Sequence, residues 1–132
     1  MEFHDRPDGA TAGDIASWEK AFKMLMPEDL KQLLTLSNGP VLFDAATDKE
    51  LQFWSVEEAI DAPDVYGLED ECPDAVPIAM DGSGNLVVYR KVSRRPAAVY
   101  AMASGNLGWE EAVRVCNDVD GLIALPDPIA MP

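Results

Sequence analysis

The sequence has few of the side chains on which most enzymes rely. Its 132 residues include one histidine, His4, and two cysteines, Cys72 and Cys116. A single histidine near the N-terminus leaves Ser-His-Asp and Cys-His catalysis, and histidine-based metal sites, without their usual residues. Two widely separated cysteines provide neither a disulfide framework nor a zinc motif. We therefore expect no catalytic residues, no metal and no cofactor.

Long apolar runs and glycine-rich phosphate motifs are also missing. No stretch of the chain approaches the about 18 consecutive apolar residues of a membrane-spanning helix. The N-terminus, Met1–Gly9, lacks the basic and then apolar pattern of a secretion signal. The sequence contains no motif typical of a phosphate-binding loop, so nothing supports nucleotide binding. Together with the scarce cysteines, these absences predict a cytoplasmic protein that does not contact a membrane.

Basic residues are scarce as well. Lys and Arg number 10 against 24 Asp and Glu, which gives a formal net charge of −14. Twelve of the acids lie between Asp44 and Asp81, where Lys49 is the only basic residue. Such a balance disfavours binding to a nucleic-acid backbone, because the protein would release few counterions. It favours a basic protein partner or a bound cation, with solubility as the alternative explanation of the charge.

The acidic segment supplies the candidate partner-binding site. Pro63 and Pro73 interrupt this segment, so we expect its backbone to form a loop over the surface. The carboxylates around these prolines should form an exposed face that attracts a basic protein partner. The candidate residues are Asp61, Asp64, Glu69, Asp70, Glu71 and Asp74.

The clearest structural pattern lies between Val76 and Met102. Short apolar runs, rich in β-branched and aromatic residues, alternate there with clusters of turn-forming residues. The pattern predicts three consecutive antiparallel strands at Val76–Met80, Leu86–Val92 and Ala97–Met102. Three strands cannot bury both of their faces by themselves, so flanking segments must cover them.

The first connection of this meander, Asp81–Asn85, begins like a calcium-binding loop. An EF-hand loop needs glycine at its sixth position and glutamate at its twelfth, where this chain has Leu86 and Val92. The flanking residues also predict strands. We therefore interpret the connection as a hairpin turn, with Gly82 and Gly84 available for backbone conformations that other residues avoid.

The N-terminal third predicts helices. Residues 1–13 are polar and are expected to be a mobile lead-in. Two helices follow at Asp14–Met26 and Pro27–Ser37, each with apolar residues three and four positions apart, and Asn38-Gly39 ends the second. These stripes predict a buried set that comprises Ile15, Trp18, Phe22, Leu25, Leu30, Leu33 and Leu34.

After these helices the pattern changes to strands. A first strand pair is predicted at Pro40–Phe43 and Leu51–Ser55. The segment Ser55–Glu58 matches the sequence motif of a helix capping box. The helix that it begins should end near Ala62, because Pro63 cannot donate a hydrogen bond to the preceding turn.

The C-terminal part of the chain predicts one more strand, one more helix and a tail. A last strand should lie within Trp109–Cys116, and Asn117 should cap a C-terminal helix that precedes an extended tail at residues 126–132. Trp54 is expected to be buried, since large aromatic side chains usually hide most of their area. Basic residues at one hairpin end predict a charged surface that protects strand edges. They are Arg90, Lys91, Arg94 and Arg95.

The order of several of these segments resembles the SUKH superfamily, also called the SMI/KNR family. The segments are Trp18-Glu19, Met26–Leu30, Leu33-Leu34, Asn38-Gly39, Phe53–Ile60, Val76–Asn85 and Ala98–Tyr100, within a region from Asp14 to Leu125. The resemblance implies an α+β fold with a curved antiparallel sheet and packed helices, and it supplies no catalytic residues. It also implies an immunity protein that neutralises a bacterial toxin, often a nuclease or deaminase. A fungal branch instead works as a signalling scaffold in cell-wall control.

We therefore expect a single SUKH-like α+β domain at residues 14–125, with two N-terminal helices, a short middle helix and a C-terminal helix on the sheet. It should bind a basic toxin domain through the acidic candidate residues and block it stoichiometrically. Two alternatives stay open: a regulatory scaffold whose partner is not a toxin, and a small acid-rich hydrolase or cation-binding protein. A neighbouring toxin gene would favour the first function, and a pocket with converging carboxylates would favour the last.

Overall fold

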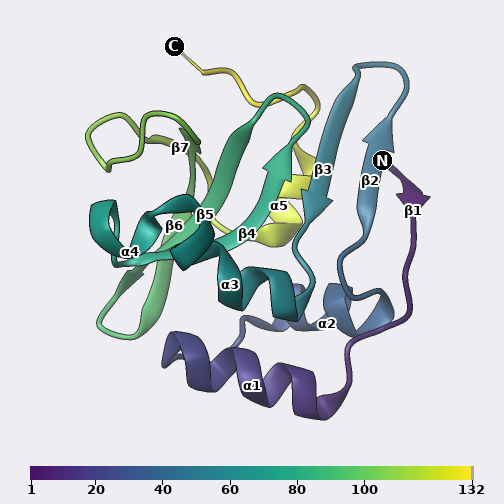
Figure 1. Cartoon of the computed structure of the whole chain (residues 1–132). Helices are drawn as coiled ribbons and strands as arrows, with labels where there is room; N and C mark the ends of the chain where they lie inside the picture. Colours follow the sequence, from purple (N-terminus) through teal and green to yellow (C-terminus); the bar gives the residue numbers. More distant parts are fainter. Residues whose placement is uncertain (132) are drawn as a thin grey trace.

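Residues 1–131, which the computed structural model describes, form one seven-stranded antiparallel sheet and five helices (Figure 1). The strands follow chain order along the sheet, so that each pairs with its neighbour in the sequence. The predicted α+β fold with an antiparallel sheet is confirmed. The strands are β1 (Glu2–Asp5), β2 (Val41–Asp44), β3 (Lys49–Phe53), β4 (Ala75–Asp81), β5 (Asn85–Val92), β6 (Arg95–Ala103) and β7 (Val113–Cys116).

The helices cover the sheet from more than one side. In Figure 1, α3 and α4 lie in front of the sheet, α5 lies behind it, and α1 and α2 lie across its lower end. Both faces of the central strands are therefore covered by flanking segments, as expected for a meander that cannot bury itself. The helices are α1 (Ala12–Phe22), α2 (Glu28–Leu36), α3 (Val56–Tyr66), α4 (Leu68–Glu71) and α5 (Val119–Ala124).

The central strand β5 is buried on both faces. Val87 and Tyr89 belong to the larger core, which α1, α2, α3 and α5 complete, whereas Leu86 and Val88 belong to a second core beneath α4. All four side chains are at most 1% exposed. A strand buried on both faces has a continuous apolar sequence and not an alternating one. The three strands predicted at the centre of the chain are confirmed as β4, β5 and β6.

The connection between β4 and β5 is a hairpin turn, as predicted. Oδ1 of Asp81 accepts hydrogen bonds from the backbone N–H groups of Ser83 (2.9 Å) and Asn85 (3.0 Å), and Oδ2 accepts one from the Asn85 amide (2.8 Å). Asp81 is only 7% exposed. Its carboxylate therefore folds the turn by replacing the backbone partners that the loop residues lack.

The prediction that Pro63 ends helix α3 is wrong. The helix continues through Pro63 to Tyr66, and α4 follows directly, so the expected acidic loop is largely helical. Proline removes one backbone donor, but other contacts outweigh this cost. The predicted capping box forms, with Glu58 N–H donating to Ser55 Oγ (3.1 Å) and Ser55 N–H donating to Glu58 Oε1 (3.2 Å). At the other end Gly67 adopts a left-handed conformation with φ of 78°, which suits glycine as a helix terminator.

The N-terminal segment also differs from the prediction. The sequence pattern predicts a mobile lead-in at residues 1–13, but Glu2–Asp5 forms strand β1, which pairs with β2 at the edge of the sheet. All four residues of β1 are exposed. An edge strand without a buried face has no apolar alternation, which is why the sequence pattern does not reveal it.

Residues 7–10 then bind the end of α2. Ser37 Oγ donates to the Pro7 carbonyl (2.7 Å), and the Ala10 N–H donates to the Leu34 carbonyl (2.7 Å). A Cβ atom added to Gly9 would lie 1.9 Å from the carbonyl oxygen of Thr35. Glycine is therefore needed at position 9 because the two backbones approach so closely.

Helix α1 is shorter than predicted. It ends at Phe22, and Lys23 adopts a left-handed conformation with φ of 54°. The residues beyond it leave the helical stripe, so Leu25 is 80% exposed whereas Met24 and Met26 are each 5% exposed. The prediction that Leu25 is buried is wrong for this reason. The other core predictions from these two helices are confirmed for Ile15, Trp18, Phe22, Leu30 and Leu34, whereas Leu33 is only partly buried.

The predictions for the strand pair β2–β3 and for the C-terminal elements β7 and α5 differ from the structure only in detail. Strands β2 and β3 pair as predicted, and β7 occupies the second half of the predicted last strand because a turn precedes it. The cap of α5 is Asp118 and not Asn117, with Asp118 Oδ1 accepting from the Gly121 N–H (2.7 Å). Trp54 is partly buried, with its ring packed edge-on against Tyr66 at a centroid distance of 5.7 Å.

Candidate functional site

The six candidate carboxylates all lie on the surface of one continuous stretch of chain. They are divided between two helices and the turn that precedes β4, and every one of them is exposed. We call this set the acidic face. It consists of Asp61 and Asp64 on α3, Glu69, Asp70 and Glu71 on α4, and Asp74 in the turn.

Two buried residues hold α4 in place. Leu68 is 1% exposed and Cys72 is 0% exposed, and both pack in the second core beneath the helix. The Cys72 N–H also donates to the Leu68 carbonyl at 2.8 Å. Because these flanking residues point into the core, the three acids between them are left on the solvent side.

The thiol of Cys72 is not arranged for nucleophilic chemistry. Burial, together with the nearby charge of Glu71, raises the pKa of Cys72, although Arg90 opposes the shift. The thiol therefore stays protonated at neutral pH, and only the thiolate is a good nucleophile. Cys72 acts as a small core residue.

The fold places further acids near α4 that lie outside the acidic segment of the sequence. The connection between β6 and β7 packs against the second core beneath α4 through Leu107 and Trp109, and it lies beside α4 in Figure 1. Glu110 and Glu111 in this connection are exposed. Because Glu110 and Glu111 are far from α4 in the sequence, their position near this helix cannot be predicted from the sequence. It depends on the pairing of β6 with β7.

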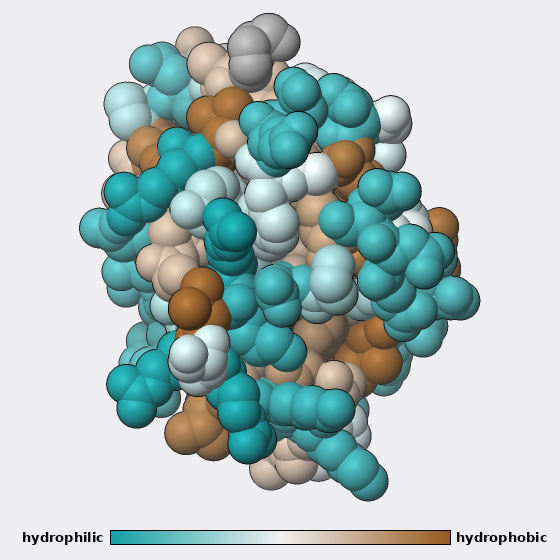
Figure 2. Space-filling model, turned by 90° about the vertical axis from the view of Figure 1, so that its left-hand side faces the viewer, coloured by the Kyte–Doolittle hydropathy of each residue, from teal (hydrophilic) through white to brown (hydrophobic). Residues whose placement is uncertain are grey.

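A cluster of large side chains accompanies these acids. The Trp109 ring packs edge-on against Tyr100 at a centroid distance of 5.3 Å, and the guanidinium carbon of Arg90 lies 4.7 Å from the centroid of the Trp109 ring. Figure 2 shows the side of the molecule on which α4 lies in Figure 1. Hydrophilic residues cover most of it, with apolar residues in separate patches between them.

A groove with a mixed polar and apolar lining lies beside the acidic face. It has a cavity volume of about 180 Å³ and is bounded by α1, α3, α4 and the strands β4 and β5. We call it the α1–α4 groove. Its lining residues include Ala21, Phe22, Ile60, Pro63, Leu68 and Glu69 from the helices, and Cys72, Pro73, Ala75, Val76 and Lys91 from the segments that follow.

The predicted basic surface has a more specific role than edge protection. Nζ of Lys91 donates to the Phe22 carbonyl at 2.9 Å, and Nε of Arg94 donates to the Lys23 carbonyl at 3.1 Å. These carbonyls lie at the C-terminal end of α1, where helix carbonyls lack intrahelical donors and attract positive charge. The hairpin between β5 and β6 therefore caps α1.

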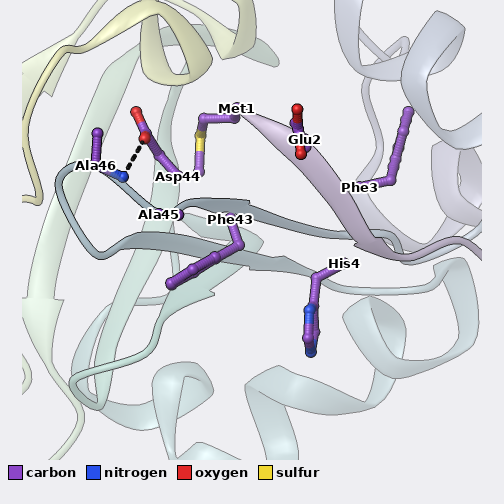
Figure 3. A pocket seen from close by; sticks show the side chains of 8 residues that line it. All are labelled: Met1, Glu2, Phe3, His4, Phe43, Asp44, Ala45 and Ala46. Carbon is purple, nitrogen blue, oxygen red and sulfur yellow. Dashed lines mark hydrogen bonds between the residues drawn. The ribbon is translucent and has the colours of Figure 1, made fainter.

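A second cavity contains the only histidine. It lies between β1 and the end of β2, where the His4 and Phe43 rings are 6.3 Å apart between centroids. Figure 3 shows the His4 ring and the Asp44 carboxylate on opposite sides of the strands, and Asp44 Oδ1 accepts a hydrogen bond from the Ala46 N–H (2.9 Å). This cavity does not bring a histidine and a carboxylate together as an acid–base pair.

No helix among residues 1–131 is long and apolar enough to cross a membrane. Within the same residues, no group of three or more His, Cys, Asp or Glu side chains is placed to hold a metal ion.

Comparison with known proteins agrees with this fold. The model of the SMI1 / KNR4 family (SUKH-1) matches residues 9–124. The chain belongs to the SMI1 / KNR4 family. It is also similar to YobM of Bacillus subtilis (strain 168), which is described as an uncharacterized protein. The two are 38% identical over 56 residues, and the match covers 39% of this chain and 30% of YobM.

Proposed function

We propose that this protein is a cytoplasmic immunity protein that binds a bacterial toxin and neutralises it by stoichiometric occlusion. The observation that carries the proposal is the acidic face, with six exposed carboxylates on one stretch of a chain that belongs to the SMI1 / KNR4 family. The partner is a basic toxin domain, such as a nuclease. The protein acts by binding and not by turnover.

The mechanism follows from charge and rigidity. A nuclease that holds a phosphate backbone presents lysine and arginine residues around its active site. The acidic face attracts such a surface over several ångströms and raises the rate of encounter. Because α4 is held by Leu68 and Cys72 in the core, its acids are presented with little loss of conformational freedom on binding. Once the protein is bound, it covers the basic site and excludes the substrate.

A growth assay tests this function. Toxin domains encoded in the same genome are expressed singly in a susceptible host, with and without this protein. Growth restored against one toxin, together with a one-to-one complex of the purified pair, supports immunity. If no toxin is neutralised and the protein binds a non-toxin partner instead, the regulatory scaffold becomes the better description.

A further inference from the structure

The α1–α4 groove has the size and lining of a site for one side chain. Its cavity volume is about 180 Å³, and apolar cavities of about 150 Å³ hold a benzene-sized group. Phe22, Leu68 and Val76 line it and are at most 7% exposed, whereas Ala21 and Pro73 are exposed at its edge. A leucine, methionine or phenylalanine side chain therefore fits.

The charges around the groove select the kind of partner. Glu69 lines it, and Asp64 and Asp74 directly follow the lining residues Pro63 and Pro73. The one basic lining residue, Lys91, already donates a hydrogen bond to the Phe22 carbonyl. A segment that enters the groove thus meets the apolar side chains of Phe22, Leu68 and Val76, with carboxylates nearby.

We infer that this groove anchors the basic partner by accepting one apolar side chain that is flanked by lysine or arginine residues of that partner. The inference rests on the proposed function and adds the part of the surface that sets the lifetime of the complex. The carboxylates attract the partner, and the buried side chain slows its release, because a few fully desolvated anchors usually dominate the binding free energy.

The test fills the groove without changing the core. Ala21 is an exposed residue of α1 at the edge of the groove, so tryptophan at this position would cover the cavity. Ala16 is an exposed residue of the same helix that does not line the groove, which makes Ala16→Trp the matched control. Both variants should unfold at the same denaturant concentration as the unsubstituted protein.

Binding kinetics are measured against catalytically inactive toxin domains from the same genome, at constant salt concentration. Ala21→Trp should raise the dissociation rate by about tenfold or more while the association rate changes by less than about threefold, because interface changes act mainly on dissociation. Ala16→Trp should change neither rate by more than about twofold.

Each result decides a separate point. If the unsubstituted protein binds a toxin and the two variants bind it equally well, the groove is not the anchor, although the proposed function stands. If the unsubstituted protein binds none of the toxin domains, the proposed function fails, and the role of the groove fails with it. If the free protein is a dimer that Ala21→Trp converts to a monomer, a second copy occupies the groove and the inference is overturned.

Discussion

The ammonium group of Lys49 on β3 donates a hydrogen bond of 2.6 Å to the backbone carbonyl of Leu125, which directly follows α5. Two further bonds reach the carbonyls of Leu122 (2.7 Å) and Ile123 (3.0 Å). Lys49 is 1% exposed. Burial lowers the pKa of Lys49, and the nearby Cys116 and Asp44 groups oppose this shift. With all three donors paired at a helix C-terminus, the ammonium group fastens α5 to the sheet.

Replacing Lys49 by methionine should destabilise the protein strongly. The apolar stem remains, but three carbonyls lose their donor, so we expect the free energy of unfolding to fall by about 2–4 kcal/mol. Lys31→Met, at an exposed position on α2, should change it by less than about 0.5 kcal/mol. Urea unfolding followed by tryptophan fluorescence measures both. Equal stability of the two variants would show that the three hydrogen bonds contribute nothing net.

Replacing Tyr89 by phenylalanine should stabilise the protein in alkaline solution. Among the described residues, the Tyr89 hydroxyl is buried and has no hydrogen-bond partner. Burial, followed by the charges of Asp29 and Asp118, raises the pKa of Tyr89 above its ordinary value. Above about pH 10 the unfolded chain loses this proton while the folded chain keeps it, so unfolding becomes easier by about 1.4 kcal/mol per pH unit.

The Tyr89→Phe variant lacks this contribution. At neutral pH it should be as stable as the original protein, or more stable by up to about 1 kcal/mol, because an unpaired hydroxyl is removed. Its advantage should grow as the pH rises above about 10. Denaturant unfolding at pH 7 and at a series of alkaline pH values measures the difference. A constant difference across the series would refute the assigned titration.

Replacing Gly9 by alanine should weaken the contact between the N-terminal segment and α2. The added methyl would lie 1.9 Å from the Thr35 carbonyl oxygen, so one backbone must move. We expect a loss of about 1–3 kcal/mol in the free energy of unfolding, as in other overpacked sites. Gly105→Ala is the control, since a Cβ atom there meets nothing within 4 Å. Thermal unfolding of the two variants provides the comparison.

Neutralising the acids of α4 should slow association with the proposed toxin partner. The triple variant Glu69→Gln, Asp70→Asn and Glu71→Gln should lower the association rate by about tenfold at low salt and by less at high salt, whereas dissociation changes little. All three positions are exposed, so stability should be nearly unchanged. Stopped-flow binding at two salt concentrations measures the rates.

A control of equal charge distinguishes local attraction from net charge. Glu2→Gln, Asp5→Asn and Glu28→Gln remove three exposed acids from β1 and α2, outside the acidic face. This variant should slow association less than the α4 variant does. If both slow it equally, the attraction comes from the whole molecule, and the acidic face has no special role.

The sequence predicts those helices and strands whose formation depends on a strong local pattern, such as an apolar run or a capping box. The meander appears in its apolar runs, and the start of α3 appears in Ser55 and Glu58, which form the predicted capping box. The errors come from contacts that only the folded chain makes. Pro63 sits inside a helix because packing and caps outweigh one lost hydrogen bond, and β1 exists because β2 supplies a partner.

The candidate site likewise has a part that the local sequence predicts and a part that only the folded chain brings together. The six acids could be selected from the charge of a single segment, and all six are exposed, but their role as a binding site stays a prediction. The α1–α4 groove could not, because it combines residues from Ala21 to Lys91 that approach one another only after the sheet has formed. Glu110 and Glu111 could not be selected either, because the pairing of β6 with β7 brings their loop to α4.

The strict chain order of the sheet determines how the protein can be assembled during synthesis. Each strand pairs with its neighbour in the sequence, although α1 and α2 separate β1 from β2, and α3 and α4 separate β3 from β4. The short connections from β2 to β3, from β4 to β5 and from β5 to β6 cost little entropy on closing and favour rapid pairing. The ribosome completes α3 and α4 before β5 and β6, which supply much of the core beneath α4. A chain interrupted between these elements would display its acidic helices together with the apolar side chains that normally hold them down.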